Sequence, residues 1–299
     1  MSTPTPLASP ATPSRPPRRT MLYLGVIAAV AIAVLLVVVF VLPGSSSSGS
    51  AASVLTYSGA LPVANGAVAG FEGGGWTPIF AAGFVSATNE TERVNSTSLG
   101  NITSYCSSVS WVSGVTSLTL SGYTGNRSSG ASPAWAFGYR NQSDALAVVT
   151  VLDGHAQVLL TLSGGYCSLY AQLFMPIPGN VIDSSQAAAA VQPDAAAFLA
   201  AHPNASAEYG LTAGVHLGTI RLGNTWSILY NSCPLNSSTG GTGDQFNATV
   251  NATSGQVLTT HTSTGVSCGS TALSTTVERS PGLGAASVAA RAERTSAPA

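Results

Sequence analysis

The stretch NATVNATSGQVL, residues 247–258, contains a strand, a tight turn and the start of a returning strand. Phe246, Ala248 and Val250 alternate with polar residues, which is the period-two pattern of a strand with one buried face. Ser254 and Gly255 are turn residues, and the chain then continues into QVLTTHT. The stretch therefore predicts an antiparallel β-hairpin.

The residues before this hairpin complete a larger unit. TWSILYNSC (225–233) alternates apolar residues as a strand does, and AEYGLTAGVHLGTI (207–220) is expected to form another strand. VIDSSQAAAAVQPDAAAFLAAHP (181–203) predicts a helix that begins at Asp183 or Ser184. Pro193 either divides that helix or starts a second one. The unit is thus a helix followed by about four antiparallel strands.

The same order recurs earlier in the chain. PAWAFGYRN (133–141) has the Trp-x-apolar-x-Tyr spacing of the later strand, and Gln-Val-Leu occurs at both 157–159 and 256–258. A helix is expected over 59–71 and a first strand over 75–87. These matches favour a diverged tandem duplication, and the alternative is that two β-hairpins simply look alike.

The fold class expected for the whole chain is α+β: a single N-terminal transmembrane helix and an ectodomain of two repeated units, each a helix with an antiparallel sheet. We expect six segments: a disordered cytoplasmic tail (1–20), a transmembrane helix (21–42), a flexible linker (43–52), a first α+β unit (53–175), a second α+β unit (176–276) and a disordered tail (277–299).

Residues 21–42, MLYLGVIAAVAIAVLLVVVFVL, are uncharged and almost entirely apolar. As a helix they would extend about 33 Å, which matches a hydrocarbon core of about 30 Å. Arg15, Arg18 and Arg19 precede the segment, so the positive-inside rule places the N-terminus in the cytoplasm and the later residues outside. The alternative is a signal peptide that is cleaved near Ala51, although the apolar core of a signal is usually shorter.

Cysteines and glycosylation sequons also favour an extracellular location. Four cysteines follow the apolar segment, an even number that suits two disulfides in an oxidising compartment. Three pairings are possible; if the repeat holds, the expected pairs lie within the units, Cys106 with Cys167 and Cys233 with Cys268. Nine of the thirteen asparagines begin Asn-x-Ser/Thr sequons, which predicts N-glycosylation. They are Asn89, Asn95, Asn101, Asn126, Asn141, Asn204, Asn236, Asn247 and Asn251.

Composition excludes several classes of function. Only 7 % of the residues are charged and the net charge is −1, so the chain lacks the basic surface that nucleic-acid binding requires. All ten cationic residues are arginines. Without lysine there is no P-loop lysine, no Schiff-base lysine and no kinase lysine.

The stretch GVSCG (265–269) matches the G-x-S-x-G pattern of the hydrolase nucleophile elbow. That elbow requires a strand that leads into a helix, with an acid and a histidine further along the chain. No convincing helix follows here, and no histidine occurs after His261. We interpret the match as coincidental.

The four histidines, His155, His202, His216 and His261, have no H-x-x-x-H spacing. His155 lies in an Asp-Gly-His turn and His261 lies beyond the matching hairpin. A metal site in which His155, His216 or His261 converges with a carboxylate is an alternative to solvent-facing or hydrogen-bonded histidines.

The carboxylates have structural interpretations. Asp153 lies in a turn, Glu90 and Glu92 lie in a sequon cluster and should be solvated, and Asp183 and Asp194 resemble helix-start residues. No catalytic, cofactor-binding or metal-binding residue is assigned, and no cofactor is expected.

The aromatic pairs Trp135/Tyr139 and Trp226/Tyr230 could line a ligand groove. Alternating aromatic residues more often fill the core between a sheet and a helix, and we favour that interpretation.

The order of a helix, a strand, a Trp-x-x-x-Tyr strand and FNATVNATSGQVL resembles the PepSY-like domain family. The resemblance covers about 181–262 and, more faintly, 57–162; the charged turn residues of that family are mostly replaced here. It implies a small binding or regulatory module outside the membrane, in some members linked to peptidase control, and it implies no catalytic residues.

The sequence therefore predicts a single-pass cell-membrane glycoprotein with an extracellular C-terminal domain and a non-enzymatic binding, accessory or envelope role. The alternatives are a PepSY-type regulator or inhibitor of an extracytoplasmic peptidase, and a metal-dependent hydrolase. The membrane is an expected partner, together with an envelope protein or a peptidase. Nucleic acid is not expected, and no small-molecule ligand is indicated.

Overall fold

The structure is a computed structural model that describes residues 53–71, 74–85, 91–95, 106–111, 117–121, 126–217, 220–233 and 241–268. None of the helices in these ranges is both long and apolar enough to cross a membrane. The segment predicted to do so, 21–42, lies outside the described residues, as do the predicted tails at 1–20 and 277–299 and the predicted linker at 43–52.

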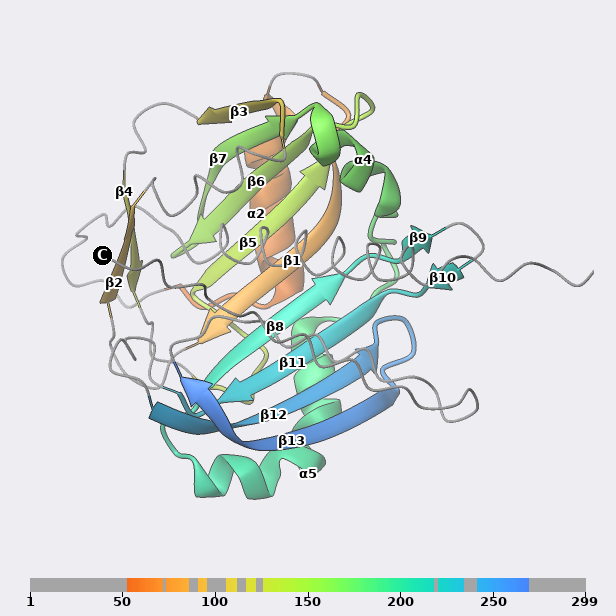
Figure 1. Ribbon diagram of the computed structural model, residues 1–299. Coiled ribbons are helices and arrows are strands. Elements are labelled where there is room, and N and C mark those ends of the chain that lie inside the picture. Colours follow the sequence, from red (N-terminus) through yellow and green to blue (C-terminus); the bar gives the residue numbers. More distant parts are fainter. Residues whose placement is uncertain are drawn as a thin grey trace, which may run out of the picture.

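The fold class is α+β, with one large antiparallel sheet of nine strands (Figure 1). In sheet order the strands are β13 (Val257–Cys268), β12 (Gly241–Asn251), β11 (Thr225–Asn231), β8 (Ser206–Thr212), β1 (Thr77–Val85), β5 (Ala134–Arg140), β6 (Leu146–Leu152), β7 (His155–Ser163) and β3 (Ser108–Trp111).

Three helices and two small ribbons complete the described fold. The helices are α2 (Tyr57–Ala69), α4 (Gly165–Leu173) and α5 (Ser184–Ala201). One ribbon pairs β2 (Thr91–Asn95) with β4 (Ser117–Ser121), and the other pairs β9 (Val215–Leu217) with β10 (Ile220–Leu222).

Apart from β3, the strand order is symmetric about its centre. The first half runs α2, β1, β5, β6 and β7, and the second half runs α5, β8, β11, β12 and β13. The first strands of the two halves, β1 and β8, pair antiparallel with each other, with Gly83 opposite Tyr209. Both halves therefore belong to one continuous sheet, and the chain does not form two separate sheets.

Helices α2 and α5 lie on the same face of this sheet, behind it in Figure 1. Tyr57 of α2 contacts Trp135 of β5 and Trp226 of β11, at ring-centroid distances of 6.3 and 5.5 Å. Because paired residues share a face of the sheet, Val151 opposite Trp135 and Leu211 opposite Trp226 also point into the core, where both are buried. The core is thus shared by both halves.

Each tryptophan makes an equivalent hydrogen bond to the backbone just before the helix of its own half. The indole N–H of Trp135 donates to the Leu55 carbonyl at 2.7 Å, and that of Trp226 donates to the Ile182 carbonyl at 3.1 Å. Each carbonyl lies two residues before the first residue of its helix, α2 or α5. The Trp-x-x-x-Tyr strand therefore fixes the entry of the preceding helix in both halves.

The two helix starts also contact each other. Ser184 Oγ accepts a hydrogen bond from the backbone N–H of Tyr57 at 2.9 Å, and Asp183 Oδ1 accepts one from the N–H of Ser58 at 2.8 Å. Asp183 is the N-cap of α5 and forms a capping box with Gln186. One acidic residue thus serves the first turns of two helices, whose N–H groups have no partners within their own helix.

Three sequence expectations differ from the structure. Helix α5 continues through Pro193, because buried Val191 and Ala195 hold both sides of the proline against the sheet. Asp194 is consequently exposed within the helix and does not start one. The strand expected over 207–220 stops at Thr212, and a separate short strand begins at Val215.

Two disulfides join Cys106 to Cys167 and Cys233 to Cys268. The first connects the chain just before β3 to α4, and the second connects the end of β11 to the end of β13. Each disulfide therefore joins two cysteines of the same half, one disulfide in each half, as expected from the repeated order.

Candidate functional site

The histidines do not come together. His155 begins β7 and His261 lies on β13, two strands that six other strands separate in the sheet, and both side chains are exposed. His202 follows α5, and His216 lies on β9. Within the described ranges, no three His, Cys, Asp or Glu side chains are close enough to share a metal ion.

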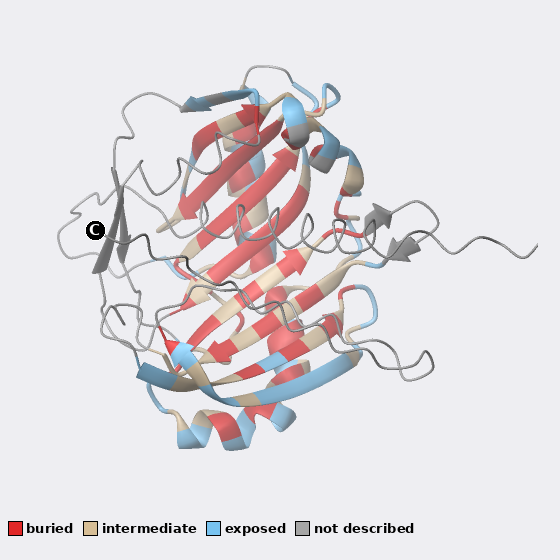
Figure 2. Ribbon diagram, viewed as in Figure 1, coloured by how far each residue is buried: buried red, intermediate tan, exposed pale blue. Residues whose placement is uncertain are grey.

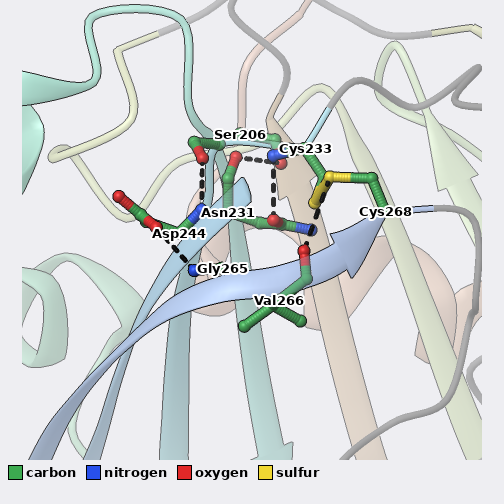
Figure 3. The surroundings of a disulfide bond; sticks show 8 residues. Ser206, Asn231, Cys233, Asp244, Gly265, Val266 and Cys268 are labelled. Atoms are coloured by element: carbon green, nitrogen blue, oxygen red, sulfur yellow. Dashed lines mark hydrogen bonds between the residues drawn. A yellow bond between two sulfur atoms is a disulfide. The ribbon is translucent and has the colours of Figure 1, made fainter. Parts of the chain in front are cut away.

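His202 instead contacts Asp244, with 3.3 Å between Nε2 and Oδ2. The imidazole also packs on the ring of Phe198 at 4.5 Å. The other carboxylate oxygen of Asp244 accepts a hydrogen bond from the N–H of Gly265 (Figure 3). Asp244 therefore joins the end of α5 to the bend in β13.

The G-x-S-x-G match ends a strand and does not form an elbow. Gly265 has a positive φ of 67° at an irregular point of the β12–β13 pairing, and Ser267 pairs with Thr242. Cys268 follows at once in its disulfide with Cys233 (Figure 3). Gly269, the last residue of the pattern, lies outside the described residues.

The aromatic pairs are core residues and do not line a groove. Trp135, Tyr139, Trp226 and Tyr230 are each at most 1 % exposed. Tyr139 donates to Asn65 Oδ1 at 2.8 Å, and burial raises the pKa of Tyr230 to about 12. These residues stabilise the sheet–helix interface.

The remaining predicted carboxylates are dispersed. Asp153 lies in the β6–β7 turn with a φ of 49°, and Asp183 caps α5. Burial by itself would raise the pKa of Asp183. Hydrogen bonds from Ser58, Thr56, Ser185 and Ser184 together lower the pKa by more than burial raises it, so the pKa lies below its usual range. Glu92 is on β2, and Glu90 lies outside the described residues.

The sequons differ in exposure. Asn126, Asn204 and Asn247 are exposed and Asn251 is half-buried, whereas Asn141 is only 6 % exposed. Asn95 ends β2, and Asn89, Asn101 and Asn236 lie outside the described residues.

The side chain of Asn141 closes the turn between β5 and β6. Its Oδ1 accepts hydrogen bonds from the N–H groups of Ser143 and Ala145, both at 2.9 Å. Asn251 uses the same device, because its Oδ1 accepts from the N–H groups of Thr253 and Ser254.

The two halves differ on the face of the sheet away from α2 and α5. In the first half this face is apolar, with buried Phe80 and Ala82 on β1 and buried Val148 on β6. In the second half it carries hydroxyl and amide groups, and Figure 2 shows half-buried and exposed positions along β8, β11 and β12. We call this second surface the polar face; its residues are Glu208, Thr212, Thr225, Ser227, Leu229, Asn231, Asn247 and Thr249.

Glu208 is the carboxylate of the polar face, and nothing in its sequence context distinguishes it. In register it lies opposite Phe84 of β1 on one side and Leu229 of β11 on the other. Burial raises the pKa of Glu208 to about 7. Among the described residues no arginine or histidine forms an ion pair with it.

The polar face can therefore offer neutral hydroxyl and amide groups together with one carboxyl that both donates and accepts hydrogen bonds near neutral pH. Backbone groups of these inner strands are used in the sheet, so recognition here would depend on side chains.

No protein family model, no curated protein and no solved structure matches this chain.

Proposed function

We propose that the protein is a membrane-anchored, glycosylated cell-surface protein with a non-enzymatic binding role, and that the polar face is its binding surface. The anchor would be the apolar segment 21–42, with the N-terminus in the cytoplasm and the domain of residues 53–268 outside. The two disulfides and the exposed sequons are compatible with that location.

The observation that carries the proposal is the position of Glu208 within a row of hydroxyl and amide side chains. On a sheet face that only contacts solvent, a carboxylate would be expected to be fully hydrated. Glu208 instead lies between Phe84 and Leu229 in the sheet register. A half-buried carboxyl near its pKa can exchange hydrogen bonds with an uncharged, hydroxyl-rich ligand at little electrostatic cost. We therefore expect a saccharide of the cell envelope as the ligand class.

The test uses the full chain in lipid nanodiscs with an array of envelope saccharides. Binding should weaken about tenfold in Glu208→Ala and in Ser227→Val, since each removes a polar group from the contact. Asp194→Ala is the matched control, because Asp194 is exposed on α5 at the opposite face. The proposal fails if no saccharide binds, or if the full chain turns over peptide or ester substrates and a single substitution abolishes that turnover.

A second candidate is a PepSY-type regulator of an extracytoplasmic peptidase. It is favoured by the order α5, β8, β11, β12 and β13, a helix followed by antiparallel strands that end in the hairpin of residues 241–268. The full chain should then inhibit or activate a co-expressed envelope peptidase. Failure to bind any such peptidase would count against this candidate and leave the first one intact.

A further inference from the structure

Strand β13 ends the sheet and has an open edge. Among the described residues it pairs only with β12, and its other edge has no partner strand (Figure 1). Thr259, Thr260, His261 and Thr262 are exposed, and Leu258 is 47 % exposed. The strand is twelve residues long, Val257–Cys268.

Between its two irregular points, this edge lacks the features that usually prevent strands from pairing between molecules. Natural edge strands are protected by charged residues, proline, bulges or short length. Residues 257–268 contain no Asp, Glu, Lys, Arg or Pro. The irregular points in the β12–β13 register lie near the two ends, and Thr259–Ser263 pair regularly with Thr249–Gln245 between them.

The opposite end of the sheet is protected. There, β3 pairs with the last four residues of β7, Ser108 opposite Ser163 and Trp111 opposite Leu160. Strand β3 belongs to the long connection between β1 and β5. The equivalent connection in the second half runs from β8 to β11 through the β9–β10 ribbon, and β11 and β12 separate it from β13. Among its described residues, the second half therefore has no equivalent of β3 at its edge.

We propose that the open edge of β13 pairs antiparallel with β13 of a second copy of this chain, about a two-fold axis. The residue on such an axis faces its own copy, so a formal charge at that position would meet a like charge. An uncharged, threonine-rich strand avoids that repulsion, and threonine pairs across strands are favourable. The sheet would then continue through both copies.

The chain already uses this geometry internally. Strands β1 and β8 hold equivalent positions in the two halves and pair antiparallel, which leaves α2 and α5 on one face. A β13 pair about a two-fold axis perpendicular to the sheet would keep both copies of α5 on the same face. A two-fold axis perpendicular to the sheet keeps each side chain on the same face of the sheet. Residues directly opposite each other then share a face, so their numbers differ by an even number, and one residue of β13 must lie opposite its own copy.

Cysteine scanning tests this arrangement in the full chain, in membranes. Single cysteines replace Thr259, Thr260, His261, Thr262 and Ser263 in turn, and mild oxidation follows. A disulfide needs Cα atoms within about 7 Å, so one position should give at least about tenfold more self-cross-linked dimer than its neighbours. The control is Gln142→Cys, an exposed residue of the β5–β6 turn. Peptide mapping verifies that the Cys233–Cys268 disulfide is retained.

A charge provides the second arm. A glutamate in place of the cysteine at the position that cross-links best should reduce the dimer fraction of the detergent-solubilised full chain about tenfold in sedimentation, since each carboxylate would face its own copy across the axis. Gln142→Glu should leave the dimer unchanged. Cross-linking that is equal at all five positions, absent, or directed to a different protein would overturn the proposal.

Discussion

The hydroxyl of Ser184 accepts a hydrogen bond from the backbone N–H of Tyr57, although 127 residues separate them in sequence. The adjacent carboxylate of Asp183 does the same for Ser58. The start of α5 therefore completes the first turn of α2, and each half of the molecule depends on the other at this point.

Asp183→Ala should lower the free energy of unfolding by about 2 kcal/mol or more at pH 7, because two helix starts lose a cap. Asp194→Ala, on the exposed side of α5, should change it by less than about 0.5 kcal/mol. Urea unfolding of both variants measures the difference. Equal effects of the two substitutions would contradict the shared cap.

The same carboxyl makes a pH prediction. The pKa of Asp183 is lower in the folded protein than in the unfolded chain, so its stabilisation is present above the unfolded pKa of about 4 and is lost as pH falls through the folded pKa. The difference in stability between wild type and Asp183→Ala should therefore shrink in acid. A difference that stays constant from pH 7 to pH 2 would rule this out.

Glu208→Gln should have the opposite pH dependence. Because the pKa of Glu208 is raised to about 7, the stabilising effect of its neutral form is complete below the unfolded pKa and is lost as pH rises through about 7. The variant should thus match wild type at pH 4 and exceed its stability by about 1–2 kcal/mol at pH 8, with water at this half-buried site limiting the gain. Thermal unfolding at both pH values tests this, with Asp194→Asn as the control.

Gly130→Ala should destabilise the protein by about 2–4 kcal/mol. Gly130 has a φ of 71°, and an added Cβ would lie 2.3 Å from the carbonyl oxygen of Ser184. Gly66→Ala is the control, since Gly66 is in α2 with no atom within 4 Å of an added Cβ. That substitution should instead stabilise by about 0.5–1 kcal/mol. Opposite signs in the two unfolding curves are the expected result.

Joint replacement of Cys233 and Cys268 by serine should cost about 4 kcal/mol, because the disulfide closes a sequence separation of 35 residues in the unfolded chain. Hydrogen exchange should accelerate along β13, which the disulfide and β12 hold in place. Unchanged exchange in β13 would show that pairing with β12 is sufficient.

Glycan mapping by mass spectrometry should find Asn126 and Asn204 occupied and Asn141 unoccupied. The side chain of Asn141 is buried and holds the β5–β6 turn, whereas the other two are exposed. A glycan on Asn141 would require that turn to open. Asn141→Ala should therefore reduce stability without changing the glycan pattern, and Asn204→Gln should remove one glycan without reducing stability.

Sequence alone determined the local elements of this protein. The period-two pattern of Trp226, Ile228 and Tyr230 gave a strand with one buried face, and Asp183 was one of the two expected helix starts. The order of one helix and four strands could be predicted for both halves, since side-chain periods and capping signals are properties of consecutive residues. Pro193 was misjudged because the packing of α5 on the sheet outweighs a local helix-breaking signal.

Only the tertiary structure decided what the elements form together. The pairing of β1 with β8 joined the halves into one sheet, and it set Glu208 between Phe84 and Leu229, residues far from it in sequence. The folded structure also buries Asn141 and leaves Asn247 exposed, although both begin the same sequon pattern. The physical reason is that strand register and burial depend on which distant strands meet, and no local period in the chain carries that information.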